Sequence, residues 1–152
     1  MSFLEGKEVP SHEHFMKMAL EEAKIAFSKD EVPVGAVLVC KGQIIGRSHN
    51  LTEMLVDVTA HAEMQVITMG ASYLGGKFLN TCQLYVTLEP CTMCAGALFW
   101  SRIGTLVYGA SDTKQGYSKT ESDVLHPKTK VIGGVLEDEC SKILSDFFKN
   151  KR

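Results

Sequence analysis

Residues 34–46, VGAVLVCKGQIIG, predict the centre of the fold. Residues 34–40 carry only apolar side chains or glycine, which is typical of a strand that is covered on both faces. Lys41 and Gly42 supply a turn, and residues 43–46 follow as the second strand of a hairpin. We therefore expect residues 34–40 to form a central strand of a sheet.

The segments on both sides of this hairpin alternate between helical and strand patterns. Ser11 is suited to cap a helix that runs to about Lys29, because Phe15 and Ala19 begin an apolar face at helical spacing. Three further helices are predicted. The first starts at Thr59 or Ala60 and ends at Leu74, the second starts at Pro90, and the third runs from Leu136 to Lys149. Further strands are predicted from Cys82 to Leu88, from Ile103 to Tyr108 and at Val131 and Ile132, with loops at residues 47–59 and 109–129. Strands that alternate with helices predict an α/β sandwich.

Length, composition and charge exclude several classes of protein. A chain of 152 residues fits one domain, residues 1–152, in which about residues 1–10 form a loose N-terminal segment. Its longest apolar stretch, residues 34–40, is too short to cross a bilayer, so no membrane association is expected. The first residues lack the pattern of a signal peptide, which predicts a cytoplasmic location. A net charge of −2 argues against indiscriminate nucleic-acid binding, although bases slightly exceed acids in residues 101–152.

Two short motifs, HAE at residues 61–63 and PCTMC at residues 90–94, contain the residues that indicate metal binding and proton transfer. They supply an imidazole, a carboxylate and two thiols near the starts of two predicted helices, where the helix dipole favours thiolates. The spacing of Cys91 and Cys94 places both on one helix face, whereas His61 and Glu63 can approach one ion together only from a first helical turn. Three protein ligands with an open fourth position are typical of catalytic zinc, and Glu63 then remains free for proton transfer.

A Cys-x-x-Cys motif has other uses, which the rest of the sequence makes less favourable. A redox pair does not require His-x-Glu upstream, and a closed structural zinc site would require a second Cys-x-x-Cys or a histidine pair, which the sequence lacks. The remaining cysteines, Cys40, Cys82 and Cys140, are predicted to be core residues because nothing indicates an exported, disulfide-bonded protein.

Two polar residues near the motifs have open interpretations. Asn50 lies in the loop before the second helix, where its amide suits either a nucleoside contact or the stabilisation of a turn. Glu89 directly precedes Pro90, and we assign it no catalytic role because a carboxylate at a strand end serves equally well as a structural hydrogen-bond acceptor.

The two motifs resemble the signature of the zinc-dependent cytidine deaminase superfamily. A longer set of segments is similar to the bacterial tRNA-specific adenosine deaminases: EVPVGAV at 31–37, TAHAE at 59–63, LYVTLEPCTMCAGA at 84–97, SRIG at 101–104, DVLH at 123–126, DEC at 138–140 and LSDFF at 144–148. This resemblance covers nearly the whole chain from Ser11. It implies a three-layer α/β/α sandwich around a mixed five-stranded sheet.

The resemblance also implies an activity, the hydrolytic deamination of adenosine to inosine at the wobble position of a tRNA anticodon. It implies a homodimer with one Zn²⁺ per subunit, held by His61, Cys91 and Cys94, in which Glu63 carries the proton to the ring nitrogen and then to the departing ammonia. Contacts with the substrate are implied at Asn50 for the nucleoside, at the backbone near Ala62 for the base, and at Phe147, Phe148 and Lys149 for the RNA of the anticodon loop.

Two other functions remain open at the level of sequence. The first is a small-molecule deaminase of the same fold that acts on guanine, cytosine or a free nucleoside such as cytidine, which the modest basic excess also fits. The second belongs to a different class, a catalytically idle zinc protein that binds RNA or a partner chain and in which Glu63 is purely structural.

Overall fold

The computed structural model describes residues 10–120 and 122–151. The predicted loose segment at residues 1–10 lies, apart from Pro10, outside this part. The helices and strands, in chain order, are α1 (His12–Ser28), β1 (Gly35–Cys40), β2 (Gln43–His49), α2 (Ala62–Leu74), β3 (Cys82–Leu88), α3 (Thr92–Ser101), β4 (Thr105–Ala110), the 3₁₀ turn Tyr117–Lys119, β5 (Lys130–Ile132) and α4 (Glu137–Lys149).

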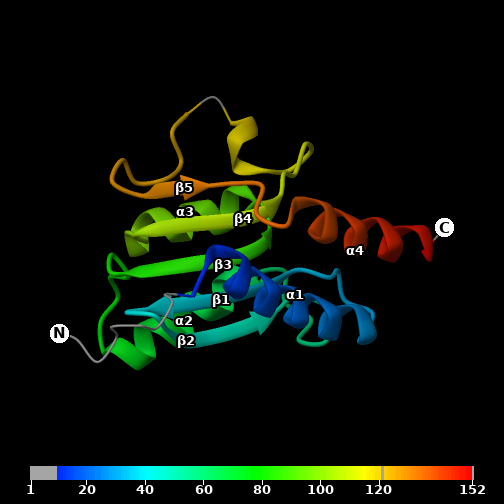
Figure 1. The fold of residues 1–152 in the computed structure, drawn as a ribbon, viewed down its shortest axis with the longest axis horizontal. Coiled ribbons are helices and arrows are strands. Elements are labelled where there is room, and N and C mark those ends of the chain that lie inside the picture. Colours follow the sequence, from blue (N-terminus) through cyan, green and yellow to red (C-terminus); the bar gives the residue numbers. More distant parts are fainter. Residues whose placement is uncertain (1–9, 121, 152) are drawn as a thin grey trace.

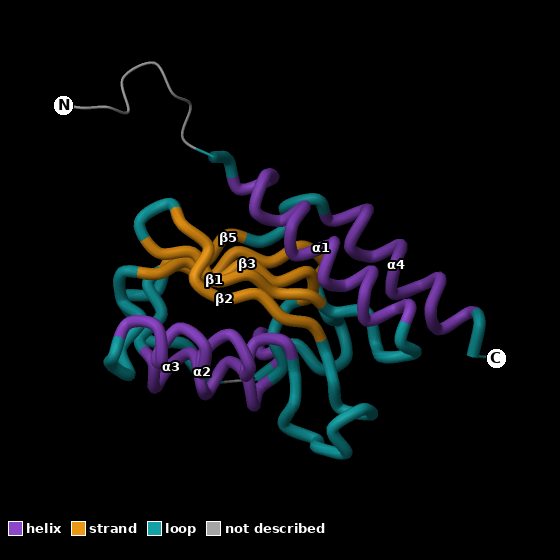
Figure 2. The backbone as a smooth tube through the Cα atoms, turned by 90° about the horizontal axis from the view of Figure 1, so that it is seen from below, coloured by secondary structure: helices purple, strands orange, loops and turns teal. Residues whose placement is uncertain are grey.

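The strands form one sheet in the order β2-β1-β3-β4-β5 (Figure 1). β1 is antiparallel to both of its neighbours, whereas β4 is parallel to β3 and to β5. Helices α1 and α4 cover one face of the sheet, and α2 and α3 cover the other (Figure 2). The predicted three-layer α/β/α sandwich with a mixed five-stranded sheet is therefore confirmed. None of the helices in residues 10–120 and 122–151 has the length and apolar character needed to cross a membrane.

The central strand β1 separates two hydrophobic clusters. All six of its residues are buried, and successive side chains point to opposite faces because the side-chain period of a strand is two residues. Leu38 therefore packs with Val66 of α2, whereas Val37 packs with Phe15 and Met16 of α1. This double coverage explains why the strand is apolar at every position and confirms the prediction made from residues 34–40.

Gly35, at the start of β1, allows α1 to lie directly against the sheet. A Cβ atom on this residue would lie 2.0 Å from the carbonyl oxygen of Ala19 and 2.5 Å from the amide nitrogen of Ala23. Both atoms belong to the backbone of α1, so they cannot move without moving the helix. The glycine is thus required for the contact between the first helix and the sheet.

Several element boundaries differ from those predicted. β2 continues beyond Gly46 to His49 because the start of β1 needs a partner, and its polar end pairs Arg47 with Val37 and His49 with Gly35. β4 begins at Thr105 rather than Ile103 and ends at Ala110, where it remains paired with β3. α2 begins at Ala62, after the predicted start. In each case pairing across the sheet or the cap geometry, which are not local in sequence, decides the boundary.

The segments that carry the motifs lie together at the edge of the sheet that is formed by strand ends, not at an edge strand. The parallel strands β3 and β4 end together where Leu88 pairs with Ala110. β1 runs in the opposite direction, so its start and the end of β2 reach the same edge, where Gly35 pairs with His49. Crevices beyond the carboxyl ends of parallel strands are common binding sites in α/β folds.

Candidate active site

Two helix N-termini meet at this edge and carry the motif residues. His61 is the N-cap of α2 and Cys91 is the N-cap of α3, and Cys94 follows in the first turn of α3. Both caps have extended backbone and make no side-chain cap hydrogen bond. N-caps usually use such a bond to satisfy a backbone N–H, as Ser11 does for His14 at the start of α1. The His61 and Cys91 side chains are instead directed toward each other.

The imidazole and the two thiols form a compact cluster. The His61 Nδ1 atom lies 3.5 Å from the Cys94 Sγ atom and 3.7 Å from the Cys91 Sγ atom. One ligand atom from each residue lies within 4.8 Å of the others, so the three could hold a metal ion. The cluster has three members among the residues that the structure describes, which leaves one position of a tetrahedral ion for a non-protein ligand.

The two thiols differ in their affinity for a proton. The hydrogen bond from the Cys94 thiol, together with the neighbouring His61, lowers the pKa of Cys91 to about 4. The same hydrogen bond and burial raise the pKa of Cys94 well above its ordinary value. The hydrogen bond with Cys91 raises the pKa of His61. Cys91 therefore loses its proton more readily than Cys94, and a metal that binds both sulfurs as thiolates has to compete with the proton of Cys94.

Glu63 lies in the first turn of α2, beside the cluster. Its side chain is buried, and it lines the same cavity as His61 and Cys91. Burial raises the pKa of its carboxyl group above the ordinary value, so Glu63 holds a proton more readily than an exposed glutamate does, which suits a group that accepts and donates protons. Helical geometry separates His61 and Glu63 in the regular part of a helix, but their location at the cap and first turn places both at one cavity, as the sequence predicts.

The cavity has a volume of about 260 Å³ and is bordered by two loops. The loop between β2 and α2 contributes Asn50 and Thr52, and the loop after β4 contributes Asp112 and Gln115. Such a volume is small for a binding site. It suits one compact ring system rather than a whole nucleotide, so any remaining part of a ligand must lie outside the cavity.

The predicted substrate contacts occupy different environments. Asn50 is buried and lines the cavity, and its Oδ1 atom also accepts a hydrogen bond of 3.4 Å from the amide of Thr52. Both interpretations of this residue, a pocket contact and a turn stabiliser, are thus compatible with its position. Ala62 is buried in the cavity wall.

The three residues at the end of α4 are not equivalent. Phe147 is buried, with its ring packed edge-on against Phe27 at 5.7 Å between centroids. This packing leaves little of its ring available to a ligand. Phe148 and Lys149 are exposed. Of the aromatic pair, only Phe148 therefore presents a free face near the end of the helix.

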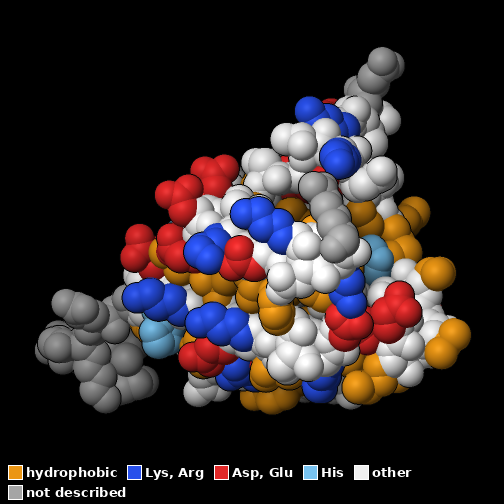
Figure 3. All heavy atoms as spheres, turned by 90° about the vertical axis from the view of Figure 1, so that its right-hand side faces the viewer, with side chains coloured by type: hydrophobic (Ala, Val, Ile, Leu, Met, Phe, Trp, Pro, Cys, Tyr) orange, Lys and Arg blue, Asp and Glu red, His pale blue; other side chains and the backbone are white. Residues whose placement is uncertain are grey.

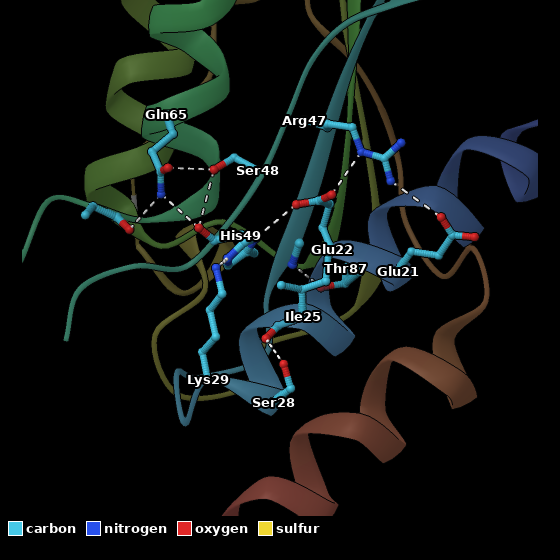
Figure 4. Close-up of polar contacts among 12 residues, drawn as sticks. Glu21, Glu22, Ile25, Ser28, Lys29, Arg47, Ser48, His49, Gln65 and Thr87 are labelled. Atoms are coloured by element: carbon cyan, nitrogen blue, oxygen red, sulfur yellow. Dashed lines mark hydrogen bonds and ion pairs between the residues drawn. The ribbon is translucent and has the colours of Figure 1, made fainter. Parts of the chain in front are cut away.

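A hydrogen-bond network behind the cavity connects the loop after β2 with α2. The Gln65 Nε2 atom donates to the carbonyl oxygens of His49 at 2.8 Å and Ala60 at 3.2 Å, while its Oε1 atom accepts from the Ser48 hydroxyl at 2.6 Å (Figure 4). The Gln65 amide thus connects His49, which precedes Asn50, with Ala60, which precedes His61. No local pattern in the sequence indicated Gln65, because two of its partners, Ser48 and His49, lie on β2.

The same network extends outward to the buried carboxylate of Glu22. His49 Nδ1 and Arg47 Nε each lie 2.9 Å from a carboxylate oxygen of Glu22 in α1 (Figure 4). His49 was predicted to be a loop or surface residue, and it is instead the last residue of β2. The sequence also left Glu89, Asp112 and Gln115 without a role, although all three line the cavity.

Comparisons with known proteins agree with this geometry. The family model described as MafB19-like deaminase matches residues 10–152. The tRNA-specific adenosine deaminase of Agrobacterium fabrum is 49% identical over 144 residues, which span 91% of this chain and 95% of that protein. The chain belongs to the tRNA-specific adenosine deaminase family.

Solved structures of other deaminases resemble this deaminase to different extents. A structure from a study of A-to-I editing by tRNA:A34 deaminases at the wobble position of transfer RNA is 48% identical, with a TM-score of 0.81, and the match covers 86% of this chain and 99% of that one. The guanine deaminase of Bacillus subtilis is 38% identical with a TM-score of 0.65, but the match covers only 68% of this chain and 66% of that one. The fuller match is thus with the deaminase that acts on tRNA.

Proposed function

We propose that this protein converts adenosine to inosine at the wobble position of a tRNA anticodon, using a zinc ion held by His61, Cys91 and Cys94. The observation that carries the chemistry is the convergence of these three side chains with the buried carboxyl group of Glu63 at one cavity. The substrate class is supported by the extent of the similarity to tRNA-specific adenosine deaminases, which spans almost the full length of both chains.

The distances within the cluster fit zinc. Typical Zn–S and Zn–N bonds in a tetrahedral site place a sulfur and a nitrogen ligand about 3.6 Å apart, and the two separations from His61 Nδ1 are 3.5 and 3.7 Å. Two sulfur ligands and one imidazole also form a donor set that zinc prefers. Bound there, zinc would act as a Lewis acid that makes a water molecule nucleophilic near neutral pH.

The protein's own groups complete the reaction. Glu63 would accept a proton from the attacking water and deliver it to the purine ring nitrogen. It would then take the remaining proton of the added hydroxyl group and transfer it to the amino group, which leaves as ammonia. Asn50 would hold the nucleoside, and the backbone at Ala62 would contact the base. The small volume of the cavity supports a mechanism in which only the target base enters, because the sugar and the neighbouring nucleotides must remain outside it.

The RNA would lie across the edge of the molecule on which α4 ends. Phe148 and Lys149 are exposed there and are suited to stack on a base and to pair with a phosphate. Figure 3, which views this side, shows acidic and basic side chains intermingled with exposed hydrophobic atoms. We therefore expect recognition of one RNA structure rather than general binding through a basic surface. A tRNA substrate also favours the predicted cytoplasmic location.

We further propose a homodimer with one zinc site per subunit. Large apolar side chains are exposed on α2, α3 and the loop between β2 and α2, including Tyr73, Trp100, Val56 and Val58. Exposed apolar surface of this kind often marks a contact with another protein. Sedimentation velocity at micromolar concentration tests the assembly, and a monomer would contradict it.

The activity is tested with purified protein that has been loaded with zinc. Anticodon stem-loops with a wobble adenosine are incubated in parallel with free adenosine, guanine, cytosine and cytidine, and the products are separated by chromatography. We expect inosine in the stem-loop and no product from the small molecules. Xanthine, uracil or uridine would instead support the small-molecule deaminase, which the similarity to guanine deaminase keeps as the second candidate. A zinc-loaded protein that converts none of them would contradict both.

A further inference from the structure

Four glutamate side chains are buried in the part of the chain that the structure describes: Glu22, Glu31, Glu63 and Glu89. Burial of a carboxylate is costly unless charges or hydrogen bonds compensate it. Glu63 belongs to the proposed catalytic site, and Glu22 is paired with Arg47 and His49 (Figure 4). Among residues 10–120 and 122–151, neither Glu31 nor Glu89 forms an ion pair. Their compensation comes from backbone amides of the two loops that border the cavity.

Glu89 binds both ends of the loop after β4. Its Oε1 atom accepts a hydrogen bond of 3.1 Å from the amide of Asp112, and its Oε2 atom accepts from the amide and hydroxyl of Ser118 at 3.0 and 2.6 Å. The loop passes so close to this carboxylate that a Cβ atom on Gly116 would lie 2.4 Å from Oε2. Both Asp112, which is one attachment point, and Gln115, which lies between Asp112 and Ser118, line the cavity.

Glu31 binds the opposite loop in the same way. It follows α1, and its Oε1 and Oε2 atoms accept hydrogen bonds from the amides of Glu53 at 3.0 Å and Met54 at 2.7 Å. These amides directly follow Thr52, which lines the cavity together with Asn50. Each loop at the cavity is thus attached by one buried carboxylate that is itself outside the cluster of His61, Cys91 and Cys94.

This arrangement makes the separation of the loops depend on two side chains that need not touch the reacting atoms. Hydrogen bonds from backbone N–H groups to a carboxylate are stronger than those to a neutral acceptor. A carboxylate accepts on both oxygens, whereas the amide of glutamine accepts on one and presents an N–H group on the other. Replacement by glutamine would therefore turn one attractive contact in each loop into a repulsive one while preserving the volume of the side chain.

We propose that Glu31 and Glu89 are positioning residues, which hold the two loops of the cavity at the separation that the target nucleotide requires. This inference rests on the deaminase function proposed above. Because both carboxylates lie outside the cluster of His61, Cys91 and Cys94 and their oxygens are bound to loop amides, the substitutions Glu31→Gln and Glu89→Gln are expected to weaken substrate binding without altering the chemical step. Each should raise the KM for the stem-loop by about tenfold, the equivalent of one hydrogen bond of about 1.4 kcal/mol. The kcat and the zinc content should stay within about twofold of wild type.

Three further variants test the inference, and the first of them separates positioning from stability. Thr129→Val removes a hydrogen bond of 2.7 Å to the Ile103 carbonyl, which lies before the start of β4 and thus at the opposite end of this strand from the cavity, so it should lower the unfolding temperature and leave KM unchanged. The double variant of Glu31 and Glu89 should raise KM by the product of the single effects, because no hydrogen bond joins the two loops among the residues that the structure describes. Ser118→Ala removes one of three hydrogen bonds to Glu89 and provides a milder test if Glu89→Gln does not fold. It should raise KM by a smaller factor.

Hydrogen exchange gives a readout that does not depend on the reaction. The amides of Glu53 and Met54 should exchange faster in Glu31→Gln, and those of Asp112 and Ser118 faster in Glu89→Gln, with the amides of β1 unchanged. Unaltered exchange in these loops, or lower stability and zinc content with an unaltered KM, would overturn the inference. A wild-type protein that deaminates no substrate would instead refute the proposed function, whereas the exchange experiment would still decide whether the two carboxylates position the loops.

Discussion

The contact between α1 and β1 offers a stringent test of the fold because it requires that residue 35 has no Cβ atom. In Gly35→Ala the new Cβ atom would meet three atoms of α1, at 2.0 Å from Ala19 O, 2.5 Å from Ala23 N and 2.8 Å from Glu22 Cβ. Ordinary contacts of this type are near 3.5 Å or longer. Relief of the shortest contact would thus displace the helix from the sheet by roughly 1.5 Å.

The cost of this displacement follows from the packing that it disturbs. Met16, Ala19 and Ala23 are fully buried between α1 and the sheet, so any separation opens gaps along the interface. Overpacking of a core typically costs about 1–3 kcal/mol, and backbone atoms cannot yield by rotating. We expect a loss of roughly 2–3 kcal/mol in the free energy of unfolding, which lowers the Tm by about 4–12 °C for a protein of this size.

Gly96→Ala provides the matched control. Gly96 lies inside α3, and a Cβ atom there would have no neighbour within 4 Å. The same substitution should therefore stabilise the protein by about 0.5–1 kcal/mol, because alanine loses less backbone entropy in a helix than glycine does. Both variants are measured by urea unfolding, with equal m values as the check that the transition remains comparable. A Gly35→Ala protein as stable as Gly96→Ala would refute the close packing of α1 on β1.

Three further predictions concern the site. Glu63→Gln should retain zinc, as measured by mass spectrometry, but lose at least ~10²–10⁴-fold in kcat, because it removes the proposed proton carrier; near-normal turnover would exclude that role. Cys91→Ala should lose zinc and lower the Tm of the zinc-loaded protein, since metal binding and folding are linked, whereas full zinc occupancy would remove Cys91 from the ligand set. Zinc affinity should rise with pH through the neutral range, because the raised pKa values of Cys94 and His61 favour protonated ligands whose protons the metal has to displace, while Cys91, with a pKa of about 4, is already ionised. Calorimetry in two buffers of different ionisation enthalpy measures the released protons, and a pH-independent affinity would contradict this competition between zinc and protons.

Local sequence was informative wherever one element decides its own structure. The uniform apolar character of residues 34–40 predicted a strand covered on both faces, and β1 is buried throughout. Ser11 was predicted to cap the first helix and does so. Cys40, Cys82 and Cys140 were predicted to be core residues, and all three are buried. Burial and capping depend on side-chain polarity and on neighbours within one turn, which the sequence displays directly.

The end of β2 and the role of Glu89 show where local reasoning is insufficient. Residues 47–49 look like a loop because they are polar, but they form a strand because the start of β1 offers them unpaired backbone groups. In the sequence, Glu89 resembles any carboxylate at a strand end, because the amides that bind it belong to Asp112 and Ser118, which are distant in the sequence. Neither partner could be chosen from the sequence, since both lie on a loop whose path depends on the parallel pairing of β3 with β4.

Residue identities alone set the chemistry available to this protein, because His61, Glu63, Cys91 and Cys94 specify which atoms can bind a metal or carry a proton. The shape of the cavity in which that chemistry can occur depends instead on the folded chain. Its boundaries come from hydrogen bonds between buried carboxylates and backbone amides of distant loops. Every residue except proline has such an amide. The pattern of side chains therefore does not show which amides the fold places next to a carboxylate and which remain in contact with water.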